Sequence, residues 1–248
     1  MTEQTQVTAP QGLGSIIMNV FSSPGEAFVG LKEGESRATL WVVSLVLLIT
    51  IASIFSYVIF TNDTLKGQIL DAQMQALQNR VDAGSITQDQ MDQQRSAMER
   101  MGGMMIAFGI IGSVITLSIM FFGAGLVLWL IGKFALKSPA GYGKYLEMYG
   151  VTNWIGIFGG IVTLLMVMGL NTLYATPSAG LAVFSAYDPT NTTHKILSAI
   201  NVFSIWQAVV VGIGLGKLTD KSATTGIGIA VGLWIVWVAV QMALGLAR

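Results

Sequence analysis

The sequence has no cysteine and few charged residues. Of its 248 residues, 10% are Asp, Glu, Lys or Arg, against roughly a quarter in an ordinary soluble domain. A soluble domain of this length would need far more charge to cover its surface. Without cysteine there is no disulfide, no thiol nucleophile and no cysteine-based metal or iron–sulfur site. The 13 basic residues balance 13 acidic ones and form no basic stripe, which argues against nucleic-acid binding.

Long apolar runs account for most of the chain, which is 53% hydrophobic. Each has the length of about 20 residues that a helix needs to cross a bilayer, and none holds a charged residue in its middle. The alternating pattern of barrel strands is missing, so helices are the spanning structure. The sequence therefore predicts an all-α integral membrane protein with five transmembrane helices in a membrane domain over 38–248. The predicted spans are approximately 38–60, 104–131, 151–173, 196–215 and 227–246.

Residues 1–37 are predicted to form a cytoplasmic segment with amphipathic helices. The first residues, MTEQTQVTAPQGLGSII, have no basic segment followed by an apolar core, so we expect no cleaved signal peptide. Ile16, Ile17, Val20 and Phe21 share a helical face. Ser23-Pro-Gly-Glu is typical of a capping box that opens a second short helix. The segment is either a membrane-surface anchor or a helix packed against the cytoplasmic ends of the spans.

The only sizeable polar segment, 61–103, is predicted to be a helical hairpin outside the cytoplasm. An apolar stripe repeats with helical spacing from Leu70 to Val81, and Gly84 supplies a stop. Thr87, with Gln90 three residues later, is expected to cap the second helix. Gly102-Gly103 is expected to be a weak point before the second span. The apolar stripes either pair with each other or rest on another copy or another protein.

Lysines in the short loops predict the orientation. With the N-terminus inside, the two short inner loops carry five lysines against only Glu147 and Asp220. Short loops weigh most in the positive-inside rule. We therefore expect a cytoplasmic N-terminus and an extracytoplasmic C-terminus. The five lysines are Lys133, Lys137, Lys144, Lys217 and Lys221.

Small residues one turn apart suggest close helix packing. Such pairs let helix backbones approach, either within this protein or against another one. Polar residues inside the spans usually hydrogen-bond between helices, although amides could also line a substrate path. The glycine pairs are Gly156/Gly160, Gly212/Gly216 and Gly228/Gly232, and the amides are Asn153, Asn171, Asn201, Gln207 and Gln241.

The sequence shows no catalytic, cofactor-binding or metal-binding site. His194, with Asp188 and Lys195 near it, lacks the partners that a metal site or general base needs. Met98, Met101 and Met105 could share a face, and thioethers can bind Cu(I). Methionine is also an ordinary filler of apolar gaps, and no histidine or cysteine stands beside this group. Asn62 and Asn191 begin glycosylation sequons, which matter only in a chain that passes through an endoplasmic reticulum.

Three segments resemble the Yip (Ypt/Rab-interacting protein) domain family. They are NVFSSPGEAFVGLK from Asn19, YLEMYGV from Tyr145, and NVFSIWQAVVVGIGLGKLT from Asn201. The resemblance covers nearly everything after about residue 15. It implies a five-helix membrane domain with a cytoplasmic N-terminus and no catalytic residues. Eukaryotic members are linked to Rab GTPases and vesicle traffic, whereas the short N-terminal part and long outer loop look more like the bacterial branch.

These observations favour a non-catalytic protein of the bacterial inner membrane that binds or organises other membrane proteins, or associates with itself. The hairpin and the glycine pairs are the expected contact surfaces. The alternatives are an accessory subunit of a transport or efflux complex, or a small channel or carrier. A membrane-embedded enzyme is disfavoured, because no catalytic pair occurs within the spans. No cofactor and no small-molecule substrate is indicated.

Overall fold

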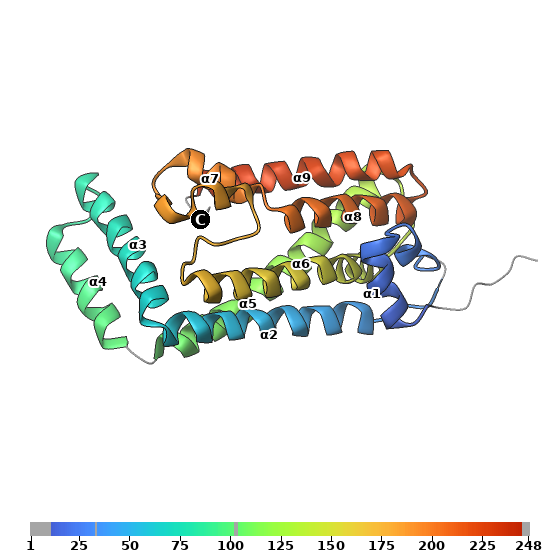
Figure 1. Ribbon diagram of the computed structural model, residues 1–248. Coiled ribbons are helices and arrows are strands. Elements are labelled where there is room, and N and C mark those ends of the chain that lie inside the picture. The colour runs from blue at the N-terminus through green and yellow to red at the C-terminus, as the bar shows by residue number, and fades with distance from the viewer. Residues whose placement is uncertain (1–10, 33, 102–103, 245–248) are drawn as a thin grey trace, which may run out of the picture. The chain divides into compact units, whose positions relative to one another are not determined.

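A computed structural model describes residues 11–32, 34–101 and 104–244. In this part of the chain the regular structure is helical, apart from an isolated bridge between Ser178 and Asn201. Five helices are long and apolar enough to cross a membrane, which confirms the predicted all-helical class (Figure 1). They are α2 (Thr39–Thr61), α5 (Met104–Leu130), which continues into the π-helix η2 (Ile131–Ala135), α6 (Tyr142–Leu170), α8 (Val202–Thr219) and α9 (Ala223–Ala243).

The chain divides into two compact units, and α2, α5 and α6 each contribute to both. The first unit comprises Met1–Leu48, Leu117–Gly159 and Val202–Ala247. The second comprises Ile49–Thr116 and Gly160–Asn201.

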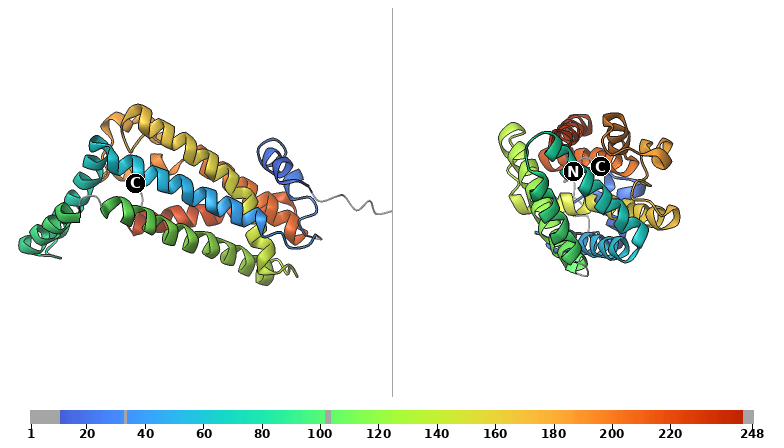
Figure 2. Two further views of the ribbon diagram at one scale, coloured as in Figure 1. Left: turned by 90° about the horizontal axis from the view of Figure 1, so that it is seen from below. Right: turned by 90° about the vertical axis from the view of Figure 1, so that its left-hand side faces the viewer.

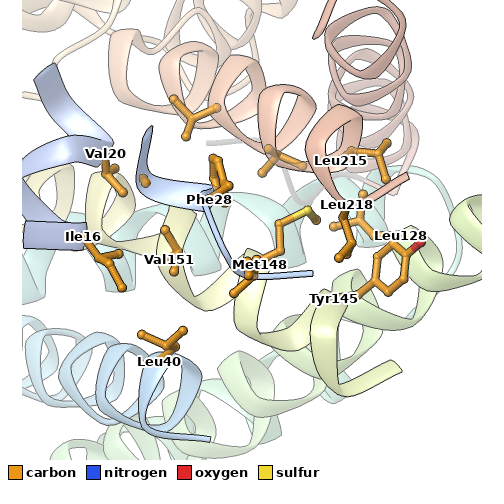
Figure 3. Packing of buried hydrophobic residues seen from close by; sticks show 14 of the residues in the cluster. Ile16, Val20, Phe28, Leu40, Leu128, Tyr145, Met148, Val151, Leu215 and Leu218 are labelled. Atoms are coloured by element: carbon orange, nitrogen blue, oxygen red, sulfur yellow. The ribbon is translucent and has the colours of Figure 1, made fainter. Parts of the chain in front are cut away.

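The first unit has a core between its N-terminal segment, α6 and α8. The short helices α1 (Leu13–Ser22) and η1 (Glu26–Phe28) direct buried apolar side chains onto these spans. Figure 3 shows Val20 close to Val151, and Met148 between Phe28 and Tyr145. In Figure 1, α1 runs across the direction of α8 and α9 rather than along it.

The capping box predicted at Ser23 is wrong. The side chain of Ser23 caps no helix; instead the Glu26 N–H donates to the Ser23 carbonyl oxygen at 2.8 Å. The carbonyl closes a tight turn around Pro24, which has no N–H of its own to donate. Only the single 3-10 turn η1 follows, and Gly30 then takes a φ of 73°, which glycine adopts without strain.

The helices at the third and fifth predicted spans begin and end at other residues than those spans. Helix α6 begins at Tyr142 rather than near Val151, because the polar side chains of its first turns find partners within the protein. It ends before Asn171, whose φ of 51° is left-handed and typical of a residue after a helix. Helix α9 covers Ala223–Ala243 instead of 227–246, because the Ser222 side chain accepts the Thr225 N–H at 3.1 Å and caps it.

The predicted fourth span, 196–215, combines two helices. The short helix α7 covers Thr192–Ala199, and α8 begins only at Val202. Between them, Asn201 forms the bridge with Ser178, while the Ile200 carbonyl oxygen accepts the Ala179 N–H at 3.0 Å. Apolar content alone does not reveal this break, because Ile200 continues the apolar run.

The second unit contains two polar helices that lie side by side, α3 (Asp63–Asp82) and α4 (Gln88–Met101) (Figures 1 and 2). The Asn62 side chain caps α3 by accepting the Thr64 and Leu65 N–H groups. At α4, the Gln90 N–H donates to the Thr87 hydroxyl oxygen at 3.2 Å, and the Thr87 N–H donates to the Gln90 side-chain oxygen at 2.9 Å. The reciprocal bonds confirm the capping box that the sequence predicts there.

Candidate functional site

His194 lies in a folded loop rather than in a group of catalytic side chains. Its Nδ1 atom accepts the Asp188 backbone N–H at 2.9 Å, and its ring contacts that of Tyr187. Tyr187 in turn stacks on Tyr174, with ring centroids 4.3 Å apart. Hydrogen bonds from the Thr190 hydroxyl and N–H lower the pKa of Asp188 below its ordinary value. The contacts of His194 therefore connect parts of one loop.

Both sequon asparagines cap helices. Asn191 accepts the Thr193 and His194 N–H groups at 2.8 and 3.3 Å. Asn62 caps α3, and its side-chain NH2 group donates to the Asn171 side-chain oxygen at 2.9 Å. A glycan at Asn62 would be attached to the nitrogen that makes this bond.

One pair of amides meets within the first unit. The Gln207 side-chain NH2 group donates to the Asn153 side-chain oxygen at 2.9 Å, which joins α8 to α6. Asn153 is 4% exposed, and its own NH2 group has no partner among the described residues. The Gln207 oxygen lies against Gly156. The other predicted amides do not join this pair: Asn171 and Asn201 shape the loop after α6, and Gln241 is half-buried on α9.

The sequence did not predict that Glu147, near the start of α6, is a buried carboxylate. Glu147 is fully buried and accepts the Ser36 hydroxyl at 2.6 Å and the Arg37 N–H at 2.9 Å. Its second oxygen lies 3.2 Å from the Lys144 ammonium, which also donates to the Gly34 and Glu35 carbonyls. The network attaches the segment that precedes α2 to the first turns of α6. The spacing of Lys144 and Glu147, three residues apart at the edge of an apolar run, was the available signal.

The glycine pairs differ in what they contact. A Cβ at Gly212 would overlap the Ile227 backbone, and one at Gly226 would overlap the Gly212 carbonyl oxygen. Glycine at these positions is what lets α8 and α9 pack so closely. At Gly228 and Gly232, in contrast, no described atom lies within 4 Å of where a Cβ would be, apart from adjacent residues and the backbone of α9 itself.

The apolar stripes of α3 and α4 include buried side chains. Leu77 of α3 and Met91 of α4 are buried, and Leu65 packs with Ile59 and Val167. Among the described residues of α3 and α4, no large apolar side chain is exposed. These burials favour the alternative in which the stripes pair within the chain, and that alternative stays a prediction.

No group of three or more possible metal-binding side chains from His, Asp and Glu occurs in the described part of the chain. Of the three methionines, Met98 is half-buried on α4 and Met105 is buried on α5. The side chain of Met101 and the predicted weak point at Gly102-Gly103 lie outside the described residues.

Comparison with known proteins identifies the family. The Yip1 domain model matches residues 18–245, which includes all five long apolar helices. No curated protein and no solved structure matches the chain. The family consists of non-enzymatic membrane proteins, and five apolar helices would place this protein in the lipid bilayer. The chain belongs to the Yip1 domain family of integral membrane proteins.

Proposed function

We propose that this protein binds or organises other membrane proteins without catalysing a reaction, and that α9 provides the contact. The observation that carries this proposal is the unfilled face of α9. Gly228, Gly232, Ile235 and Ala239 share one helical face, and Ile235 is 56% exposed. Gly226 and Ala230, which are buried, lie on the opposite face. A glycine-lined helix face is a common contact between helices in a bilayer.

A photo-crosslinking experiment tests this contact. The chain has no cysteine, so Ile235→Cys can carry a single benzophenone group in native membranes. We expect a discrete protein adduct that disappears when Gly228 and Gly232 are both replaced by Leu. A matched probe at Ile115→Cys on α5, an equally exposed apolar position, should give no such adduct. Adducts with lipid alone, or the same adducts from both probes, would refute the contact on α9.

The proposed orientation has a cytoplasmic N-terminus, with α3 and α4 outside and the C-terminus outside. It is supported by the lysines of the short loops. We propose the bacterial inner membrane as its location and a position for α1 at the inner membrane surface, which the crossing direction of α1 supports. A cysteine at Ser85 should react with an impermeant thiol reagent in intact cells, and one at Lys221 only after lysis. The reverse pattern would invert the topology.

Transport, alone or as an accessory subunit of an efflux complex, is the second candidate. It is supported by the unpartnered NH2 group of Asn153 beside Gln207, since a buried unpaired donor is costly unless something binds it. In proteoliposomes, transport by this route should be abolished by Asn153→Leu and preserved by Asn201→Leu. Absence of flux of small polar solutes through the wild-type protein would remove the channel alternative.

A further inference from the structure

The C-terminal end of α5 continues into a π-helical turn. Over Ile131–Ala135 the helix widens into η2, and π-helical turns are frequent at functional positions. The Tyr145 ring packs so closely on Gly132 that any side chain there would overlap it. The Gly132 carbonyl oxygen accepts the Ser138 N–H at 2.9 Å, after Lys137 has taken a φ of 60°. Packing and backbone hydrogen bonds therefore hold this turn in a defined conformation.

The turn presents a lysine on aromatic rings. The Lys133 ammonium lies 4.9 Å from the centroid of the Trp129 ring and 5.7 Å from that of Phe134. The Trp129 ring also contacts Tyr142 edge to face, while Phe134 is 62% exposed. Tryptophan, tyrosine and lysine concentrate at the level of lipid headgroups, where a ring can lie in the apolar layer beside a charged group in water.

Further lysines lie at the same end of the unit. The Ser138 hydroxyl donates to the Leu218 carbonyl oxygen at 3.2 Å, which ties the turn to the end of α8. Lys137 is exposed in the turn, and Lys217 and Lys221 are exposed at the end of α8 and just after it.

Two carboxylates of this unit are engaged with other lysines. Asp220 pairs with Lys32, and Glu147 pairs with Lys144. Among the described residues, no carboxylate pairs with the remaining lysines of this end. These unpaired lysines are Lys133, Lys137, Lys217 and Lys221.

We propose that the patch formed by these four lysines with Trp129 and Phe134 binds the phosphate of an anionic phospholipid. The choice of a lipid rests on continuity with the bilayer-facing surface. Leu126 and Leu130 lie four residues apart and share a face of α5. Phe134 follows them in η2, and all three are exposed. An acyl chain can follow this apolar row, while the headgroup meets the lysines at its end. Clustered lysines beside a spanning helix are typical of anionic-lipid recognition.

The test compares two lipids on the full chain. The protein is purified in a neutral detergent, and native mass spectrometry measures the binding of phosphatidylglycerol and of phosphatidylcholine with identical acyl chains. We expect the wild type to prefer phosphatidylglycerol. The Lys133→Gln/Lys137→Gln double variant should lose about 25-fold of that affinity, at about fivefold per lysine. Binding of phosphatidylcholine should not change.

Two control variants separate a site from general charge. Lys66→Gln/Lys195→Gln removes the same charge from α3 and α7 and should keep the preference. Lys133→Arg/Lys137→Arg retains the charge and should keep it too. Equal binding of both lipids by the wild type, or an equal loss in the Lys66/Lys195 control, would overturn the proposal. So would loss of an acidic protein partner from the Lys133→Gln/Lys137→Gln variant with its lipid preference intact.

Discussion

The spanning helices and the α3–α4 pair bury opposite kinds of side chain. On the spans, large apolar side chains such as Leu165, at 63%, are exposed, whereas Thr152 and Asn153 are buried. On α3 and α4 the apolar residues Leu77 and Met91 are buried and the polar ones lie outside. The first pattern suits lipid, where packing and polar contacts hold helices together. The second suits water, where apolar burial does so.

The largest expected effect comes from the buried charge of the spanning region. Glu147→Ala leaves the Lys144 ammonium without its carboxylate and two donors without an acceptor. Removing one partner of a buried ion pair costs about 3–5 kcal/mol. We expect a large fall in melting temperature in mild detergent. Glu147→Gln keeps an acceptor oxygen for Ser36 and Arg37 and should be destabilised less.

If Glu147→Ala melts at the wild-type temperature, the network does not hold the segment that precedes α2 against α6. The spanning region would then lack its clearest example of stabilisation by polar contacts.

Backbone contact between α8 and α9 gives the next largest effect. A methyl group at Gly226 meets the Gly212 carbonyl oxygen, which cannot move away without shifting a helix. Overpacking of this kind costs about 1–3 kcal/mol. The matched variant Gly228→Ala adds the same methyl group where no described atom is near. Thermal unfolding in detergent should separate the two, with Gly226→Ala less stable and Gly228→Ala unchanged. Equal melting temperatures would contradict the close packing.

Leu77→Ala tests the water-adapted side of the comparison. Leu77 is 8% exposed, and losing a buried leucine side chain costs about 2–5 kcal/mol in a core. We expect the lower limit, about 2 kcal/mol, because two helices can close partly around the gap. Hydrogen exchange should rise in α3 and α4 and stay unchanged in the spans. Leu165→Ala, on the exposed surface of α6, should leave hydrogen exchange unchanged in both regions. Faster exchange in α6 would show that Leu165 packs against protein.

Much of this architecture could be predicted from the sequence, because long apolar runs and capping residues act locally. The five apolar helices and the Thr87 capping box depend on neighbours within a few residues. The early start of α6 could not be predicted, since Glu147 is stabilised by Ser36 and Arg37, more than a hundred residues away. The separation of α7 from α8 also depends on a distant partner, Ser178.

The candidate contacts could be predicted from the sequence only in part, for the same reason. Sequence spacing marks Gly212 and Gly228 as equivalent. Only the packing shows that α9 occupies the space beside Gly212, while the space beside Gly228 is open. The cation–π contact of Lys133 with Trp129 has the spacing of one helical turn. Its significance emerges only with the π-helical turn and the engaged carboxylates around it.

The smallest expected effect concerns pH in the loop between α6 and α8, where Asp188 is exposed. Hydrogen bonds from Thr190 lower the pKa of Asp188 below its ordinary value. A carboxyl group whose pKa is lower in the folded state stabilises it above the unfolded pKa, and this contribution disappears as the pH falls through the folded pKa. Asp188→Asn should therefore speed hydrogen exchange around His194 at pH 7. At pH 3 and below, the difference from the wild type should shrink. Asp92→Asn on α4, an exposed carboxylate with no described hydrogen bond, serves as the control at both pH values. A difference at Asp188 that is constant between pH 7 and pH 3 would mean that its charge does not support the loop.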